Sequence, residues 1–173
     1  MKKLIAHTLI GLAAVAPLSA VAAPTSADPV RLMKSLGVTM VERDVCFSKD
    51  NLATYNSGTN TFCMATSTFH ASRQKLDETV THEAVHVIQD CLAGGLSTSQ
   101  SSSLADFMVT QGYSREKVND MFIGRIKKKG LEGHVLDVAK ESPANWHARH
   151  EAEAYAIMDE PQIVYDLLKK VCR

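Results

Sequence analysis

The stretch TVTHEAVHVI at residues 79–88 decides both the fold and the chemistry that this sequence predicts. His82 and His86 are four residues apart, so on a helix both imidazoles leave the same face. Such a pair offers two nitrogen ligands to one Zn²⁺, and Glu83 stands beside them as a base for a water at the metal. The other seven positions of the stretch are uncharged, as the surroundings of a buried metal centre require.

Apolar residues recur at three- and four-residue spacing around this stretch and extend the expected helix over residues 76–92. Before it, segments 38–47, 53–55 and 61–66 are expected strands, with a turn at 56–60 between the last two. The remaining expected helices lie at 30–36, 104–111, 115–128, 162–171 and from 142 to before Pro161. The expected fold class is α+β, with a small antiparallel sheet packed on the active-site helix and additional C-terminal helices.

A hydrolytic zinc needs a third protein ligand and one open position, and residues 79–88 supply only two ligands. The metzincin spacing would place Gly and His at positions 89 and 92, where this chain has Gln89 and Leu92, so that class is excluded. The richest later cluster of possible ligands is WHARHEAEAYA at residues 146–156, on the helix expected after Pro143.

With these motifs the chain resembles the gluzincin zinc metallopeptidases, in which a glutamate on a downstream helix completes the site. Several such families carry that glutamate in an E-x-E-A pattern, which EAEAY at 151–155 matches. The resemblance implies a zincin-like fold with one Zn²⁺ per chain, held by His82, His86 and Glu151. Glu153 lies about 200° around the helix from Glu151 and cannot share its face. The alternatives for the third ligand are Glu153, His150 and His147.

Many gluzincins carry an acidic residue four positions after the third ligand, where it hydrogen-bonds the first histidine. This chain has Tyr155 at that position. We expect the Tyr155 hydroxyl to hydrogen-bond His82 or to donate to the oxyanion of the reaction, and a place in the core is the third alternative.

A narrower resemblance is to the mitochondrial inner-membrane metallopeptidases that process an ATP synthase subunit. It rests on Phe62-Cys63, on residues 80–86, on Cys91 and on the downstream E-x-x-A at 151–154. That family usually has Asp three residues after the second histidine, where this chain has Gln89 followed by Asp90. The resemblance supports the site and says little about the substrate.

The first residues have the pattern of an export signal. Lys2 and Lys3 precede an apolar run, and Ala20-Val21-Ala22 forms a cleavage signature, so residues 1–22 are an expected signal peptide. Residues 23–29 are then a flexible leader and 30–173 a single metallopeptidase domain. We expect an exported protein, periplasmic or secreted, without stable membrane insertion after cleavage.

The whole chain has 19 basic and 19 acidic residues, and this balance gives no support for binding nucleic acid. His70 and His134 stand apart from the motifs and are expected at the surface. Arg149 is expected to pair with Glu153 on the surface, and residues 127–129 to form a solvated helix end.

Four cysteines in an exported chain predict two disulfides. If the helix folds back along the strand before it, Cys91 returns toward Cys63, which favours Cys63–Cys91 with Cys46–Cys172. The main rival pattern is Cys46–Cys63 with Cys91–Cys172.

These observations predict a zinc metallopeptidase that acts on a peptide or protein substrate, with Glu83 as general base and Tyr155 as a further candidate catalytic residue. Two alternatives stay open, because the motif does not separate them. One is a zinc amidase acting on a non-peptide or cell-wall substrate, and the other is a zinc-binding interaction protein without turnover. The oligomeric state is not predicted.

Overall fold

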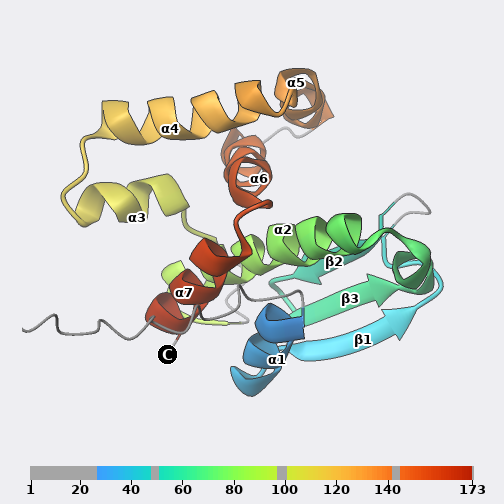
Figure 1. Cartoon of the computed structure of the whole chain (residues 1–173). Coiled ribbons are helices and arrows are strands. Elements are labelled where there is room, and N and C mark those ends of the chain that lie inside the picture. The colour runs from blue at the N-terminus through green and yellow to red at the C-terminus, as the bar shows by residue number, and fades with distance from the viewer. Residues whose placement is uncertain (1–26, 48–50, 97–100, 142–144, 173) are drawn as a thin grey trace, which may run out of the picture.

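A computed structural model describes residues 27–47, 51–96, 101–141 and 145–172. The expected signal peptide at 1–22 lies outside these residues, as does the Ser-Pro start expected for the helix after residue 141. Within them the fold is α+β, with one small sheet and seven α-helices (Figure 1). No helix in the described ranges combines the length and the apolar character that crossing a membrane requires.

The sheet has three strands in the order β1-β3-β2: β1 (Thr39–Arg43), β2 (Ala53–Asn56) and β3 (Thr61–Ala65). β2 and β3 form the expected antiparallel hairpin, with Asn60 at φ 48° in its turn. β1 pairs with β3 in parallel, so the prediction of an antiparallel sheet is wrong for this pair and the sheet is mixed. The turn at 56–60 determines only the pairing of β2 with β3. β1 and β2 lie on opposite sides of β3 and are separated by nine residues of sequence.

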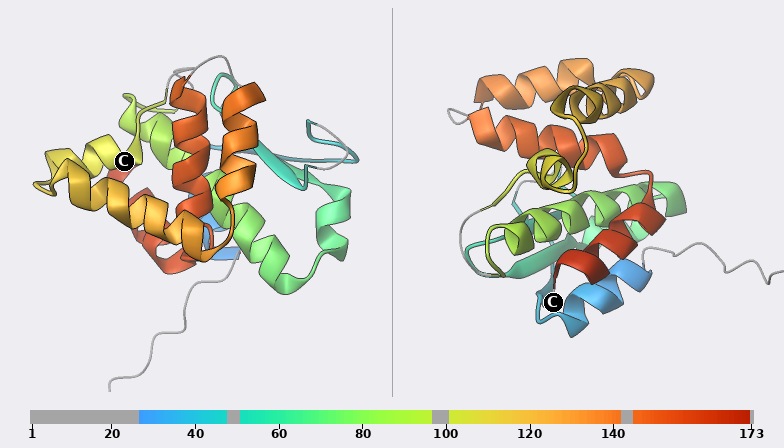
Figure 2. Two further views of the ribbon diagram at one scale, coloured as in Figure 1. Left: turned by 90° about the horizontal axis from the view of Figure 1, so that it is seen from above. Right: turned by 90° about the vertical axis from the view of Figure 1, so that its left-hand side faces the viewer.

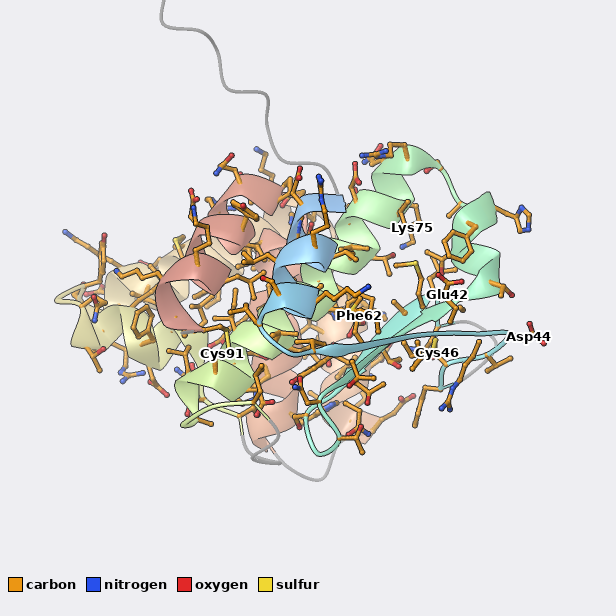
Figure 3. The ribbon with its side chains drawn as sticks, turned by 90° about the horizontal axis from the view of Figure 1, so that it is seen from below. Glu42, Asp44, Cys46, Phe62, Lys75 and Cys91 are labelled. Carbon is orange, nitrogen blue, oxygen red and sulfur yellow. A yellow bond between two sulfur atoms is a disulfide. The ribbon has the colours of Figure 1, made fainter. Side chains whose placement is uncertain are left out.

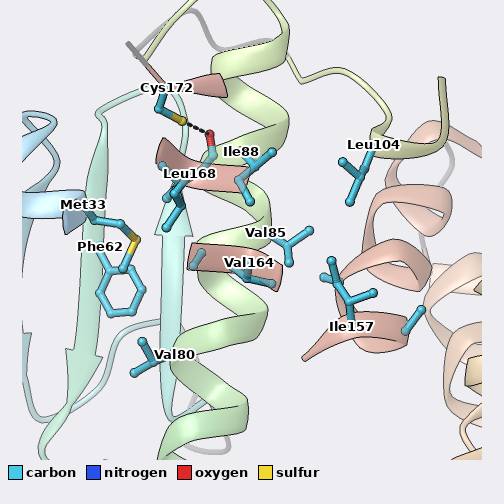
Figure 4. Packing of buried hydrophobic residues seen from close by; sticks show 14 of the residues in the cluster. Met33, Phe62, Val80, Val85, Ile88, Leu104, Ile157, Val164, Leu168 and Cys172 are labelled. Carbon is cyan, nitrogen blue, oxygen red and sulfur yellow. Dashed lines mark hydrogen bonds between the residues drawn. The ribbon is translucent and has the colours of Figure 1, made fainter. Parts of the chain in front are cut away.

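Helix α2 (Arg73–Leu92) is the centre of the molecule and lies between the sheet and a layer of helices (Figure 1). The side chain of Ser72 accepts a hydrogen bond from the Lys75 amide, which starts the helix three residues before its expected first residue. Phe62 and Val80 gather on the sheet side of α2, while Val85 points toward Ile157 on the other side (Figure 4). Because α2 is covered on both sides, its middle is buried almost all around.

Two helices close the core beside the sheet: α1 (Ala27–Ser35) and α7 (Pro161–Val171) pack on each other and on α2. α1 begins earlier than expected, so residues 27–29 belong to a helix and not to the leader. Asp28 and Pro29 in its first turn are residues that favour a helix start. The short 3-10 helix η1 (Thr66–His70) carries His70, which is exposed as expected.

The helical layer on the other side of α2 contains α3 (Leu104–Thr110), α4 (Arg115–Lys128), α5 (Glu132–Glu141) and α6 (Asn145–Ile157), as Figure 2 shows. Ser103 and Ser114 cap α3 and α4 as the sequence predicts. α5 was not among the expected helices, and none of its residues is fully buried.

Lys127 and Lys128 are exposed, as expected for a solvated helix end, whereas the Lys129 side chain is largely covered. Its ammonium donates to the carbonyls of Tyr155 and Ala156, each at 3.0 Å, and contacts Asp159. Lys129 therefore satisfies carbonyls at the end of α6 that have no partner within the helix.

The disulfides are Cys46–Cys63 and Cys91–Cys172, with Cα separations of 5.7 and 5.3 Å. The favoured pattern is therefore wrong and the rival pattern is the one that the structure holds. α2 has 20 residues and extends about 30 Å, whereas β3 spans only about 17 Å. Cys91 thus lies beyond the sheet, where α7 ends, and Cys46 and Cys91 are well separated in Figure 3.

The two disulfides close loops of unequal length, with sequence separations of 17 and 81 residues. In the chain-entropy account, replacing Cys46 and Cys63 together by serine lowers the free energy of unfolding by about 3 kcal/mol, and replacing Cys91 and Cys172 lowers it by about 4.5 kcal/mol. Denaturant unfolding of both double variants measures the difference. Equal losses, or a larger loss for Cys46 and Cys63, would contradict this order.

Candidate metal centre

The two histidines of α2 and one glutamate of α6 meet where these helices pack. Nε2 of His82 lies 3.2 Å from Nε2 of His86 and 3.3 Å from Oε2 of Glu151. Nε2 of His86 lies 3.2 Å from Oε1 of the same carboxylate. The side chains are 11–17% exposed, so three potential ligands converge in a nearly buried place. They form the one group of this kind among the described residues.

These separations fit one tetrahedral ion. Zn–N and Zn–O bonds of about 2.1 Å at tetrahedral angles place neighbouring ligand atoms about 3.4 Å apart. The donor set of two imidazoles and a carboxylate is one that zinc takes in hydrolytic sites. The residues present therefore fit Zn²⁺.

The charges of the three residues are strongly coupled. Burial disfavours the carboxylate of Glu151, but hydrogen bonds from His82 and His86 hold its pKa far below the usual value. Burial likewise opposes the charge on His86, yet the hydrogen bond to Glu151 and the charges of Glu151 and Glu83 raise the His86 pKa to about 9. The centre therefore attracts positive charge.

Glu83 points into the same place without joining the three ligands. Its Oε2 accepts a hydrogen bond of 2.7 Å from the backbone amide of Tyr55 on β2. Burial raises the pKa of the Glu83 carboxyl, while the nearby His82 and His86 lower it. A carboxyl group poised in this way is suited to take up and release a proton.

A cleft of about 1100 Å³ opens over the centre. Thr54 and Tyr55 of β2 line one wall, and His134, His147 and Tyr155 line the wall formed by α5 and α6. His82, His86 and Glu151 also line this cleft, so a molecule bound in it could reach all three side chains.

Tyr155 lies against the centre but does not orient the first histidine. Its ring centroid is 4.5 Å from that of His82, while its hydroxyl pairs at 2.7 Å with Nε2 of His134. The expected bond from this hydroxyl to His82 is absent, and Nδ1 of His82 is buried without a partner among the described residues. Burial, followed by the charges of Glu151 and Glu83, raises the Tyr155 pKa to about 12, so the hydroxyl stays protonated.

The alternatives to Glu151 do not belong to the group of converging ligand atoms. Glu153 is buried on the opposite side of α6, against the first residues of α3. Nδ1 of His150 pairs with Ser101 Oγ at 2.8 Å. His147 lines the cleft with its Nε2 at 3.7 Å from Glu151 and is half exposed. Arg149 forms the expected pair with Glu153, at 3.6 Å, but Glu153 is buried and not at the surface. Arg149 also donates two hydrogen bonds of 3.0 Å to Asp106 of α3.

Sequence reasoning missed three residues of this site. His134 is exposed, as expected, but its place in the cleft wall and its pairing with Tyr155 were not predicted. Tyr55 clamps β2 to α2, because its amide meets Glu83 and its hydroxyl donates to Asp90 at 2.7 Å. Oε1 of Gln89 lies 2.8 Å from Nδ1 of His86. Gln89 is three residues after His86, and this helical spacing could have indicated the contact.

The chain belongs to a family described as a domain of unknown function (DUF8637), whose model matches residues 38–173. No curated protein and no solved structure matches the chain.

Glu151→Ala removes one of three ligands, and we expect the protein to lose its stoichiometric zinc. Glu78→Ala is the matched control, because Glu78 lines the same cleft one helical turn before His82 and is not among the converging ligands. Elemental analysis after dialysis against a weak chelator measures bound zinc. If Glu151→Ala keeps one zinc per chain, the third ligand is wrongly assigned.

Proposed function

We propose that this protein is an exported zinc-dependent metallopeptidase, with Zn²⁺ held by His82, His86 and Glu151 and with Glu83 as general base. The observation that carries the proposal is the convergence of these three side chains within 3.2–3.3 Å, with Glu83 buried beside them. The two disulfides are compatible with an oxidising compartment.

Two features favour turnover over a silent metal site. A structural zinc is usually closed by four protein ligands, whereas three converge among the described residues and a cleft opens above them. A structural site also has no need of a carboxylate such as Glu83, whose burial beside another carboxylate costs free energy.

When bound, Zn²⁺ supplies Lewis acidity that polarises a carbonyl and acidifies a water. Glu83 takes the proton from the attacking water and delivers it to the leaving amine. The Tyr55 amide of β2 holds one oxygen of the Glu83 carboxylate, and Glu83 lines the cleft. The Tyr155 hydroxyl is on the opposite wall, where it can donate to the oxygen that becomes negative as the carbonyl is attacked.

Glu83→Gln keeps the size of the side chain and all three ligands but removes the proton acceptor. We expect bound zinc to stay near one per chain and peptide hydrolysis to fall 10²–10⁴-fold or more. Cleavage of a peptide library and of an unfolded protein, followed by mass spectrometry, measures the loss. Substantial residual cleavage would refute the role of Glu83, and hydrolysis of non-peptide amides alone would replace the peptidase by an amidase.

Tyr155→Phe tests the donor on the opposite wall. Loss of an oxyanion donor typically costs about 10²–10³-fold in kcat, and we expect a loss in kcat with little change in KM. Tyr113→Phe serves as the control, because Tyr113 is an exposed tyrosine between α3 and α4. An unchanged kcat in Tyr155→Phe would leave this residue as part of the cleft wall only.

A further inference from the structure

We propose that Gln89 and Glu153 are positioning residues that fix the tautomer of His86, so that its Nε2 lone pair faces the metal position. The inference rests on the metal centre proposed above and adds to it a buried chain of hydrogen bonds from α3 through α6 to α2. It concerns what holds a ligand in place, and its consequences appear in metal affinity as well as in activity.

The chain begins at Glu153, whose carboxylate is a fully committed acceptor. Glu153 is 2% exposed. Its oxygens accept from the amide of Leu104 at 2.7 Å, the amide of Ala105 at 3.1 Å and the hydroxyl of Ser103 at 2.5 Å. Backbone amides can only donate, so both carboxylate oxygens of Glu153 serve as acceptors toward the first turn of α3.

Glu153 in turn decides which way the amide of Gln89 points. Nε2 of Gln89 lies 2.9 Å from Oε2 of Glu153 and 3.1 Å from the backbone carbonyl of His150. Both partners are acceptors, so only the NH₂ group of Gln89 can face them. The reversed amide would set an oxygen against two buried oxygens, which is strongly unfavourable in a side chain that is 1% exposed.

The orientation of Gln89 decides the tautomer of His86. Its Oε1, which can only accept, lies 2.8 Å from Nδ1 of His86, so Nδ1 must carry the proton. A neutral imidazole then has its lone pair on Nε2, the atom that faces His82 and Glu151. His82 has no such support, because its Nδ1 lacks a partner among the described residues. The support of the imidazole ligands is therefore concentrated on His86.

The experiment reverses donor and acceptor between positions 89 and 153. Glu153→Gln replaces one of the two acceptors that hold the Gln89 NH₂ group and leaves only the His150 carbonyl to orient it. Gln89→Glu sets two carboxylates against each other. Loss of a group that orients a ligand typically weakens metal binding 10–100-fold, and we expect this for each single variant. In the double variant Q89E/E153Q, the carboxylate at position 89 accepts from His86 and from the new amide at position 153. We expect it to bind zinc at least threefold more tightly than either single variant.

Ser103→Ala is the matched control within the same network. It removes the cap of α3 and one donor to Glu153, and leaves the contact between Glu153 and Gln89 in place. We expect a lower melting temperature with zinc affinity within twofold of wild type. Competition with a chromogenic chelator gives the affinities, and ¹H–¹⁵N spectra of the zinc-loaded protein show whether Nδ1 of His86 is protonated.

Three results would overturn the inference. They are unchanged zinc affinity in both single variants, a double variant that binds no better than either single variant, and a Nδ1 of His86 without its proton in the wild type. Failure of the metal centre itself is distinguishable, because Glu151→Ala would then also keep the affinity of the wild type for zinc.

Discussion

The packing of α2 against α6 is the constraint on which the rest of the structure depends. Polar and charged side chains of both helices are buried there, and each must find a partner at a fixed position. Glu151 pairs with His82 and His86. About one turn further along α2, Gln89 donates a hydrogen bond to Glu153. A shift of either helix by one residue would break all of these contacts at once. The two helices are therefore held in a single register.

Much of the surrounding scaffold keeps these two helices in that register. Arg149 ties α6 to α3 through Asp106, and Lys129 reaches from the end of α4 to the last carbonyls of α6. On the other side, Tyr55 fastens β2 to α2 at both Glu83 and Asp90, about 10 Å apart along the helix. The Cys91–Cys172 disulfide then fixes the end of α2 to the end of α7. The side chains of the site are thus set by contacts from every neighbouring element.

The features that could be predicted are those determined by residues close together in the sequence. The spacing of His82 and His86, the caps at Ser103 and Ser114 and the hairpin turn at 56–60 each report a short-range preference. Convergence of Glu151 with the histidines agrees with the expectation taken from the family resemblance. The parallel pairing of β1 and the favoured partners of the cysteines were wrong. The contacts of His134 with Tyr155 and of Lys129 with the end of α6 were missed. Each depends on how distant elements meet, which no local pattern records.

The charge balance of the centre links the fold to the proposed chemistry. The carboxylate of Glu83 is buried and that of Glu151 is 17% exposed, both close to two imidazoles. Isolated charges in such a place would cost on the order of several kcal/mol each. Without an ion, protonation supplies the compensation, as the raised pKa of His86 shows. A dication at the same position would displace that proton and face the two carboxylates with equal and opposite charge. Only Glu151 is needed as a ligand, so the carboxylate of Glu83 remains able to bind and release a proton. That freedom is what a general base requires.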